Sequence, residues 1–184
     1  LKLASFALSR RDPDYVPRAR AAQQLEQRRA SGEALPELTE ILRALGLSEA
    51  ALPALQIGSV LFANKPGDGS AREQAASCQR VLGGCANICY EFATKRYRSN
   101  CVNWGMLPFT LAEGAPFDAK PGDFLYVPDV RAKVAAGDDC FPAMLVTPDG
   151  TRELTLYLKN TTAEERELLL TGCLMNHYAA QKRG

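Results

Sequence analysis

The chain has 184 residues, of which 46% are hydrophobic and 23% charged, and its formal net charge is +1. This size and apolar content suffice for one domain with a core, or for one domain with an extension. The near-neutral charge gives no support for nucleic-acid binding or for broad membrane binding. The sequence also has no apolar run of roughly 20 residues and no visible secretory signal, so we expect neither a membrane nor a nucleic acid as partner. We therefore expect a cytoplasmic protein.

The first 55 residues are rich in Ala, Leu, Glu, Gln and Arg, which favour helices. They predict a polar helix over 15–30, which forms an outer layer or linker, and a second helix over 36–45 that Gly46 can cap. We therefore treat residues 1–55 as a helical linker or extension and residues 56–184 as the domain proper. Because Leu1 is no initiator methionine, we expect a processed chain or, by preference, a piece of a longer protein.

From residue 56 onward, short apolar runs alternate with helical patterns. Strands are expected at 56–64 and 85–93, with a helix at 70–81 between them. Basic KRYRSN, a short helical piece and the apolar segments GMLPFTL and DFLYVP follow, and residues 143–160 predict a hairpin that turns at Pro148-Asp149-Gly150. A last helix begins at a Thr161 or Thr162 cap and runs to about Gln181. This mixture indicates the α/β class.

Six cysteines are present, but their spacing does not indicate a metal site. Cys85 and Cys89 lie four residues apart, there is no CxxC pair, and the one histidine, His177, is distant in the sequence. We expect free, buried thiols, and no metal bound by this chain.

The stretch GDGSAREQAA at residues 67–76 permits two interpretations. Ser70 and Glu73 fit a capping box, which would require no function. Alternatively, the free amides of a helix N-terminus beside glycines form an anion site, with Arg72 as a planar fork for a carboxylate. Neither a Walker A loop nor a dinucleotide fingerprint is present, so a small carboxylate fits better than a nucleotide.

Three ordered blocks over about residues 56–176 resemble the aconitase superfamily. GDGSAREQAASCQRVLGG is similar to that family's GEGSSREHAA…LGG, EFATKRYRSNCVNWGMLPF to its SFARIHETNLKKQGLLPL, and the segment 147–176 to its end. The resemblance is to the C-terminal swivelling domain, which implies a three-layer β/β/α fold.

The resemblance implies a function in the reversible dehydration and hydration of hydroxy polycarboxylic acids. The family's other three domains carry a [4Fe–4S] cluster, over which the swivelling domain closes as a lid; this chain would bind no cluster itself. By motif position, Ser70 matches the serine base and Arg72 the arginine that binds a substrate carboxylate. Gly69 and Ala71 complete the expected substrate-binding loop.

Two departures from the family pattern leave alternatives open. Ala71 replaces the family's second serine, and Gln74 replaces its histidine. The chain could instead be a stand-alone small subunit like that of isopropylmalate dehydratases, or a non-catalytic binding or regulatory module on the same fold. Outside the motif, we expect Lys95, Arg96 and Arg98 in a solvated loop, and a structural role for Asn100.

Overall fold

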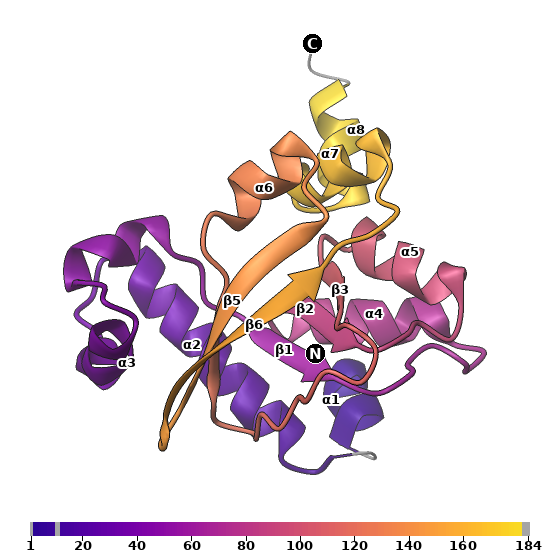
Figure 1. Cartoon of the computed structure of the whole chain (residues 1–184). Coiled ribbons are helices and arrows are strands. Elements are labelled where there is room, and N and C mark those ends of the chain that lie inside the picture. The colour runs from indigo at the N-terminus through magenta and orange to yellow at the C-terminus, as the bar shows by residue number, and fades with distance from the viewer. Residues whose placement is uncertain (1, 10–11, 182–184) are drawn as a thin grey trace.

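The computed structural model describes residues 2–9 and 12–181 (Figure 1). The helices are α1 (Lys2–Ser9), α2 (Tyr15–Ala30), α3 (Thr39–Ala44), α4 (Arg72–Val81), α5 (Lys95–Asn103), α6 (Val130–Ala136), α7 (Ala163–Thr171) and α8 (Leu174–Gln181). Short 3-10 helices cover Pro36–Leu38 and Glu49–Ala54. The strands are β1 (Ser59–Phe62), β2 (Gly84–Cys89), β3 (Leu107–Thr110), β4 (Phe124–Tyr126), β5 (Cys140–Thr147) and β6 (Gly150–Tyr157). No helix in these ranges is long and apolar enough to cross a membrane.

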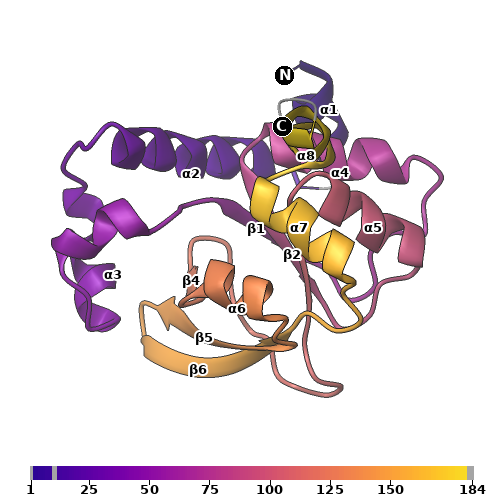
Figure 2. The same ribbon diagram turned by 90° about the horizontal axis from the view of Figure 1, so that it is seen from above.

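The strands form one sheet with the order β1-β2-β3-β6-β5-β4, which has two unlike halves. Strands β1, β2 and β3 are parallel, whereas β6, β5 and β4 pair antiparallel. A single residue pair, Thr110 with Tyr157, joins the halves. Figure 2 shows the antiparallel half as one layer, the parallel half as the next, and α2, α4, α5 and α7 as the helical layer. The predicted α/β class with its β/β/α layers is confirmed.

The main core lies where the two halves of the sheet and helices α5–α7 meet. Ile88 and Leu156 are fully buried there, and the rings of Phe109 and Phe141 pack edge to face with centroids 5.2 Å apart. Burial of side chains of this size stabilises the fold by about 1.5–3 kcal/mol each. This core fixes the parallel strands, and with them the loops at their ends.

The N-terminal helices pack against the domain proper. Ala4 of α1 and Val16 and Ala19 of α2 form a small buried cluster with Leu82, at the end of α4. The Glu26 carboxylate of α2 also accepts a hydrogen bond from the Ile57 amide at 2.8 Å. Helix α2 coincides with the polar helix predicted over 15–30. The division of the chain at residue 55 stays a prediction.

The last predicted helix is in fact two. Thr162 and Glu165 form the expected capping box of α7, but Gly172, with φ 95°, ends that helix before α8 begins. The break allows a close approach of two backbone segments, because a Cβ on Gly105 would lie 1.7 Å from the Gly172 carbonyl oxygen. Sequence periodicity cannot reveal such a contact, which joins residues far apart in the chain. Helix α6 was not predicted either.

Candidate active site

The motif loop, residues 63–71, connects β1 to α4 at the carboxyl edge of the parallel half-sheet (Figure 2). Ligands of open α/β sheets usually bind at this edge. The loop first continues beside the chain that leaves β2: the Tyr90 amide donates to the Asn64 carbonyl and the Ala93 amide to the Pro66 carbonyl. The motif therefore starts from a fixed position.

Gly67 is the anchor of the loop. Its carbonyl oxygen accepts hydrogen bonds from Arg72 Nε and from Thr94 Oγ1, both at 3.0 Å. Its φ of +97° lies in the left-handed region, and a Cβ there would stand 2.4 Å from Tyr97 Cβ. This glycine is thus required by the protein's own packing.

The next residues, from Gly69 to Ala71, are exposed to solvent. The Ser70 hydroxyl has no hydrogen-bond partner among the residues described, and neither do the amides of residues 69–72. A Cβ on Gly69 would meet no atom within 4 Å. Since no protein contact requires a glycine there, the position suits close approach of a ligand to the backbone.

Arg72 is half-buried, and its guanidinium is held from one side only. Nε donates to the Gly67 carbonyl, whereas neither terminal nitrogen has a partner within the described part of the chain. The hydrogen bond of Nε fixes the plane of the guanidinium group. It leaves the two terminal nitrogens free, which together can bind a carboxylate through two parallel hydrogen bonds. The terminal nitrogens of Arg72 are therefore available for an anion beside Ser70.

The first of the two interpretations of this stretch, a capping box of Ser70 and Glu73, is wrong. The N-cap residue of α4 is Ala71, and no side chain of the cap residue bonds to the helix. Glu73 turns away from Ser70, and its Oε1 accepts a hydrogen bond from Trp104 Nε1 at 2.6 Å. The Asn100 amide, oriented to suit its neighbours, accepts from the Glu73 amide and donates to Glu73 Oε2, each at 3.1 Å.

Asn100 thus performs the capping that Ser70 does not, and its predicted structural role is confirmed. The α4 N-terminus still carries unpaired amides and the partial positive charge of a helix start. The nearby carboxylate of Glu73 is directed toward Trp104 and Asn100, where it accepts two hydrogen bonds.

A buried polar triangle supports this loop from behind. Gln79 Nε2 donates to the Tyr97 hydroxyl at 2.9 Å, that hydroxyl donates to Asn87 Oδ1 at 3.1 Å, and Asn87 Nδ2 donates to Gln79 Oε1 at 2.8 Å. All three residues are buried. Burial, above all other causes, raises the pKa of Tyr97. The triangle joins α4, β2 and α5, and the Tyr97 ring then contacts Gly67.

The basic segment before Asn100 is not the solvated loop that we expected. It forms the first turns of α5, where Thr94 caps the helix and Tyr97 is buried. Arg98 pairs with Glu165 at 2.7 Å, with about a fifth of each side chain exposed. Lys95 and Arg96 alone are exposed. Sequence reasoning missed Tyr97 because its basic neighbours obscure the helical spacing that points it inward.

The remaining motif residues and the cysteine thiols contribute no further binding group to the site. Ala71 and Gln74 are exposed, and neither side chain contributes a hydrogen bond to the loop. All six cysteines are free; Cys89 and Cys101 are buried as expected, but Cys140 is exposed. No group of three His, Cys, Asp or Glu side chains within the described ranges could hold a metal ion.

The fold and the motif loop define an α/β domain whose serine, arginine and helix start lie together on an open surface. Residues 55–114 match the model of the aconitase C-terminal domain family. The chain is 34% identical over 116 residues to the mitochondrial aconitate hydratase of Schizosaccharomyces pombe. It is 32% identical over 135 residues to aconitate hydratase A of Bradyrhizobium diazoefficiens.

These alignments cover 61% and 69% of this chain, which spans only 14% of either relative. Among solved structures, the fold is similar to 3-isopropylmalate dehydratase (leuD) of Methanocaldococcus jannaschii, with a TM-score of 0.50 and 26% identity. That match covers 76% of this chain and 74% of the other. The chain therefore carries a C-terminal domain of the aconitase superfamily, as the sequence blocks predicted.

Proposed function

We propose that this domain is the lid of an aconitase-like hydro-lyase that acts on a small hydroxy polycarboxylic acid. The observation that carries the proposal is the joint exposure of three groups at the start of α4: the unpartnered Ser70 hydroxyl, the free amides of residues 69–72, and the open fork of Arg72. The aconitate hydratases and the isopropylmalate dehydratase to which the chain is similar support this class of reaction.

In the proposed reaction, Arg72 binds one substrate carboxylate through two parallel hydrogen bonds. Binding places the carbon next to a carboxylate beside Ser70, which acts as the base. Ser70 takes the proton of that carbon as the hydroxyl group leaves the adjacent carbon and a double bond forms, and it returns the proton when water adds across the double bond. A serine is normally too weak a base for this step. The amide donors and the helix start stabilise negative charge on Ser70 Oγ, which lowers the cost of forming its alkoxide.

The residues of this chain do not fit an iron–sulfur cluster. Such clusters need several converging thiolates, whereas burial raises the pKa of Cys85 to about 11 and the pKa values of Cys89 and Cys101 to about 12. The proposal therefore assigns the [4Fe–4S] cluster to other domains of the same protein. These cluster-bearing domains are the partners of the lid, and the open surface around Ser70 is the face that they would meet.

The test is Ser70→Ala in the whole protein. We expect turnover to fall by roughly 10²–10⁴-fold, because the proton acceptor is lost, while substrate binding changes little. Ser77→Ala is the matched control, since Ser77 lies further along α4 and its hydroxyl only donates to the Gln74 carbonyl. Normal turnover by the Ser70 variant would overturn the assignment.

A second candidate is the stand-alone small subunit of an isopropylmalate-dehydratase-like enzyme. It is favoured by the similar coverage of this chain and the solved dehydratase, 76% and 74%. The native mass of the protein that contains this chain, measured from its own source, separates the two. A polypeptide several times longer supports the lid of a single-chain enzyme, and a polypeptide near 20.0 kDa supports the subunit.

The third candidate, a non-catalytic module, rests on Ala71 and Gln74, which depart from the family pattern. Incubating the whole protein with citrate, cis-aconitate and related hydroxy acids tests it. Turnover of any of these acids excludes a purely regulatory role.

A further inference from the structure

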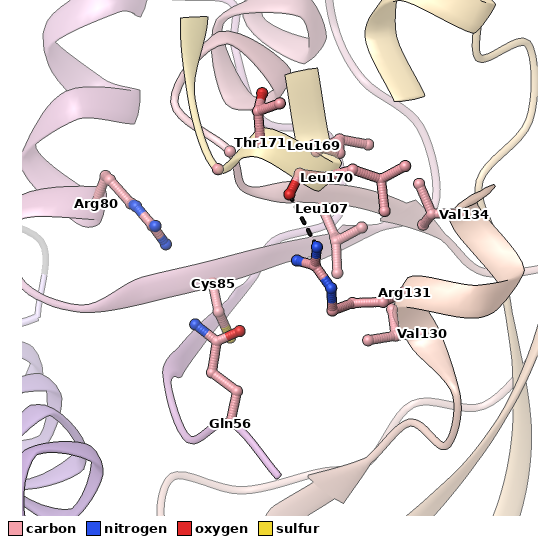
Figure 3. Close-up of a pocket in the computed structure, with 12 residues that line it drawn as sticks. Gln56, Arg80, Cys85, Leu107, Val130, Arg131, Val134, Leu169, Leu170 and Thr171 are labelled. Carbon is pink, nitrogen blue, oxygen red and sulfur yellow. Dashed lines mark hydrogen bonds between the residues drawn. The ribbon is translucent and has the colours of Figure 1, made fainter. Parts of the chain in front are cut away.

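A small cavity opens at the amino edge of the parallel strands, opposite the motif loop (Figure 3). Its volume is about 200 Å³. A single water needs about 10–15 Å³ by the same kind of measure, so the space admits a small molecule. It is below the roughly 300 Å³ at which pockets for larger ligands begin. A ligand here must therefore be small.

Two arginines face this cavity from different elements. Arg80 approaches from α4 and Arg131 from α6, and Figure 3 shows both guanidinium groups directed into the space. Each donates to a backbone carbonyl: Arg80 Nη1 to Gly84 at 3.2 Å, and Arg131 Nη2 to Leu170 at 3.1 Å. Neither forms an ion pair with an acidic residue among those described.

The lining contains no acidic side chain, so the charge of the two arginines is not balanced within the cavity. Glu26 of α2 does not line the cavity, and its carboxylate is already paired with Arg29 at 2.8 Å. The amide of Gln56 also lies at the cavity and adds a neutral donor. Two guanidinium groups and one side-chain amide that face the same space without a counter-charge favour binding of an oxyanion.

The other wall of the cavity is apolar. It is made by Leu107, Val130, Val134, Leu169 and Leu170. A purely inorganic anion would leave this wall without contacts. A ligand with a short aliphatic part would bury it against the leucines and valines, at roughly 25 cal/mol per Å² of apolar surface.

We propose that this cavity binds a small carboxylate with a short aliphatic part. The carboxylate lies between Arg80 and Arg131, and the aliphatic part contacts Leu107 and Val134. The site is separate from the motif loop: Arg80 lies eight residues after Arg72 on α4, which corresponds to roughly 12 Å along the helix. The proposal does not depend on the proposed function of Ser70.

The test uses isothermal titration of the whole protein with three probes. Isobutyrate carries both the charge and the aliphatic part, isobutyramide keeps the shape without the charge, and inorganic phosphate keeps charge without the aliphatic part. We expect isobutyrate to bind, and both other probes to bind at least about tenfold more weakly, because each loses one half of the contacts. Equal binding of the amide, or no binding of isobutyrate at tens of millimolar, would overturn the proposal.

Variants locate the site. Arg80→Gln and Arg131→Gln should each weaken isobutyrate binding by about tenfold or more, since each removes a charge-assisted contact. Arg96→Gln is the matched control, because Arg96 is exposed on α5 and does not line the cavity. Arg131 is also exposed, so its variant should fold even if the Arg80 variant does not.

Arg72→Gln distinguishes this site from the proposed active site, because Arg72 is the residue proposed to bind a carboxylate at the motif loop and does not line the cavity. Isobutyrate binding that survives in that variant but is lost in Arg80→Gln and Arg131→Gln supports a separate cavity. Binding lost in Arg72→Gln and retained in Arg131→Gln would mean that the probe occupies the motif loop instead, which would overturn the inference.

Discussion

The ring of Tyr97 packs directly against Gly67: a Cβ at residue 67 would lie 2.4 Å from Tyr97 Cβ and 2.6 Å from its Cγ. The same tyrosine donates from its hydroxyl to Asn87 and accepts from Gln79. One side chain thus connects the buried centre of the domain to the loop that presents Ser70. The conformation of the exposed motif loop therefore depends on buried residues that lie outside the motif.

The two motif glycines should respond differently to the same substitution. Gly67→Ala forces a methyl group into Tyr97 at a positive φ, and we expect it to destabilise the fold by about 2–5 kcal/mol. Gly69→Ala meets open space and should change stability by less than about 1 kcal/mol. Urea denaturation of both variants measures the difference. Equal stability of the two would contradict the role assigned to Gly67.

Removing the Tyr97 hydroxyl should destabilise the fold more than a substitution at an exposed position does. Tyr97→Phe leaves Gln79 Nε2 and Asn87 Oδ1 each without a buried partner, and we expect a loss of about 1–3 kcal/mol in the free energy of unfolding. Tyr178→Phe, at an exposed position on α8, is the control and should have little effect. A neutral Tyr97 variant would show that the triangle does not support the fold.

Arg72→Lys tests whether the planar guanidinium group of Arg72 is needed, because the substitution keeps the positive charge. Lysine cannot reproduce both the Nε contact with the Gly67 carbonyl and a bidentate carboxylate contact. For the proposed reaction of the whole protein, we expect KM to rise by about tenfold or more, with a smaller effect on stability. Arg96→Lys should leave KM as it is, and an unchanged KM in the Arg72 variant would argue against its role in substrate binding.

Two buried thiols should make the domain sensitive to alkaline pH. Burial raises the pKa values of Cys89 and Cys101 from 9.0 to about 12. Above pH 9 the unfolded chain loses these protons while the folded domain keeps them, so stability is full below pH 9 and declines as the pH rises toward 12.

The slope can reach about 1.4 kcal/mol per pH unit for each thiol. Cys101→Ala should therefore reduce the loss of stability between pH 9 and 11, as measured by denaturation at several pH values. Val102→Ala is the control: it also empties a fully buried position beside Cys101, but it removes no titrating group. An equal dependence of stability on pH in the wild type and in Cys101→Ala would contradict the raised pKa of Cys101.

Local sequence signals predicted the elements that short-range chemistry determines. The polar helix of α2, the turn at Pro148-Asp149-Gly150 and the capping box at Thr162 all depend on residues within one or two turns of each other. The same reasoning failed at Gly172 and at Ser70. In both places a distant residue decides the outcome: Gly105 approaches the break after α7, and Asn100 takes over the cap of α4.

The sequence alone determined the family of the domain, its α/β class and the residues of the motif loop, because these are encoded in ordered blocks and local periodicity. The tertiary structure decided which of those residues face solvent. Only folding brings Asn100 and Trp104 to Glu73 and places Tyr97 beneath Gly67. Those contacts join segments about 30 residues apart, so they leave no local signal in the sequence, and they are what leave the Ser70 hydroxyl and the Arg72 fork unpaired at the surface.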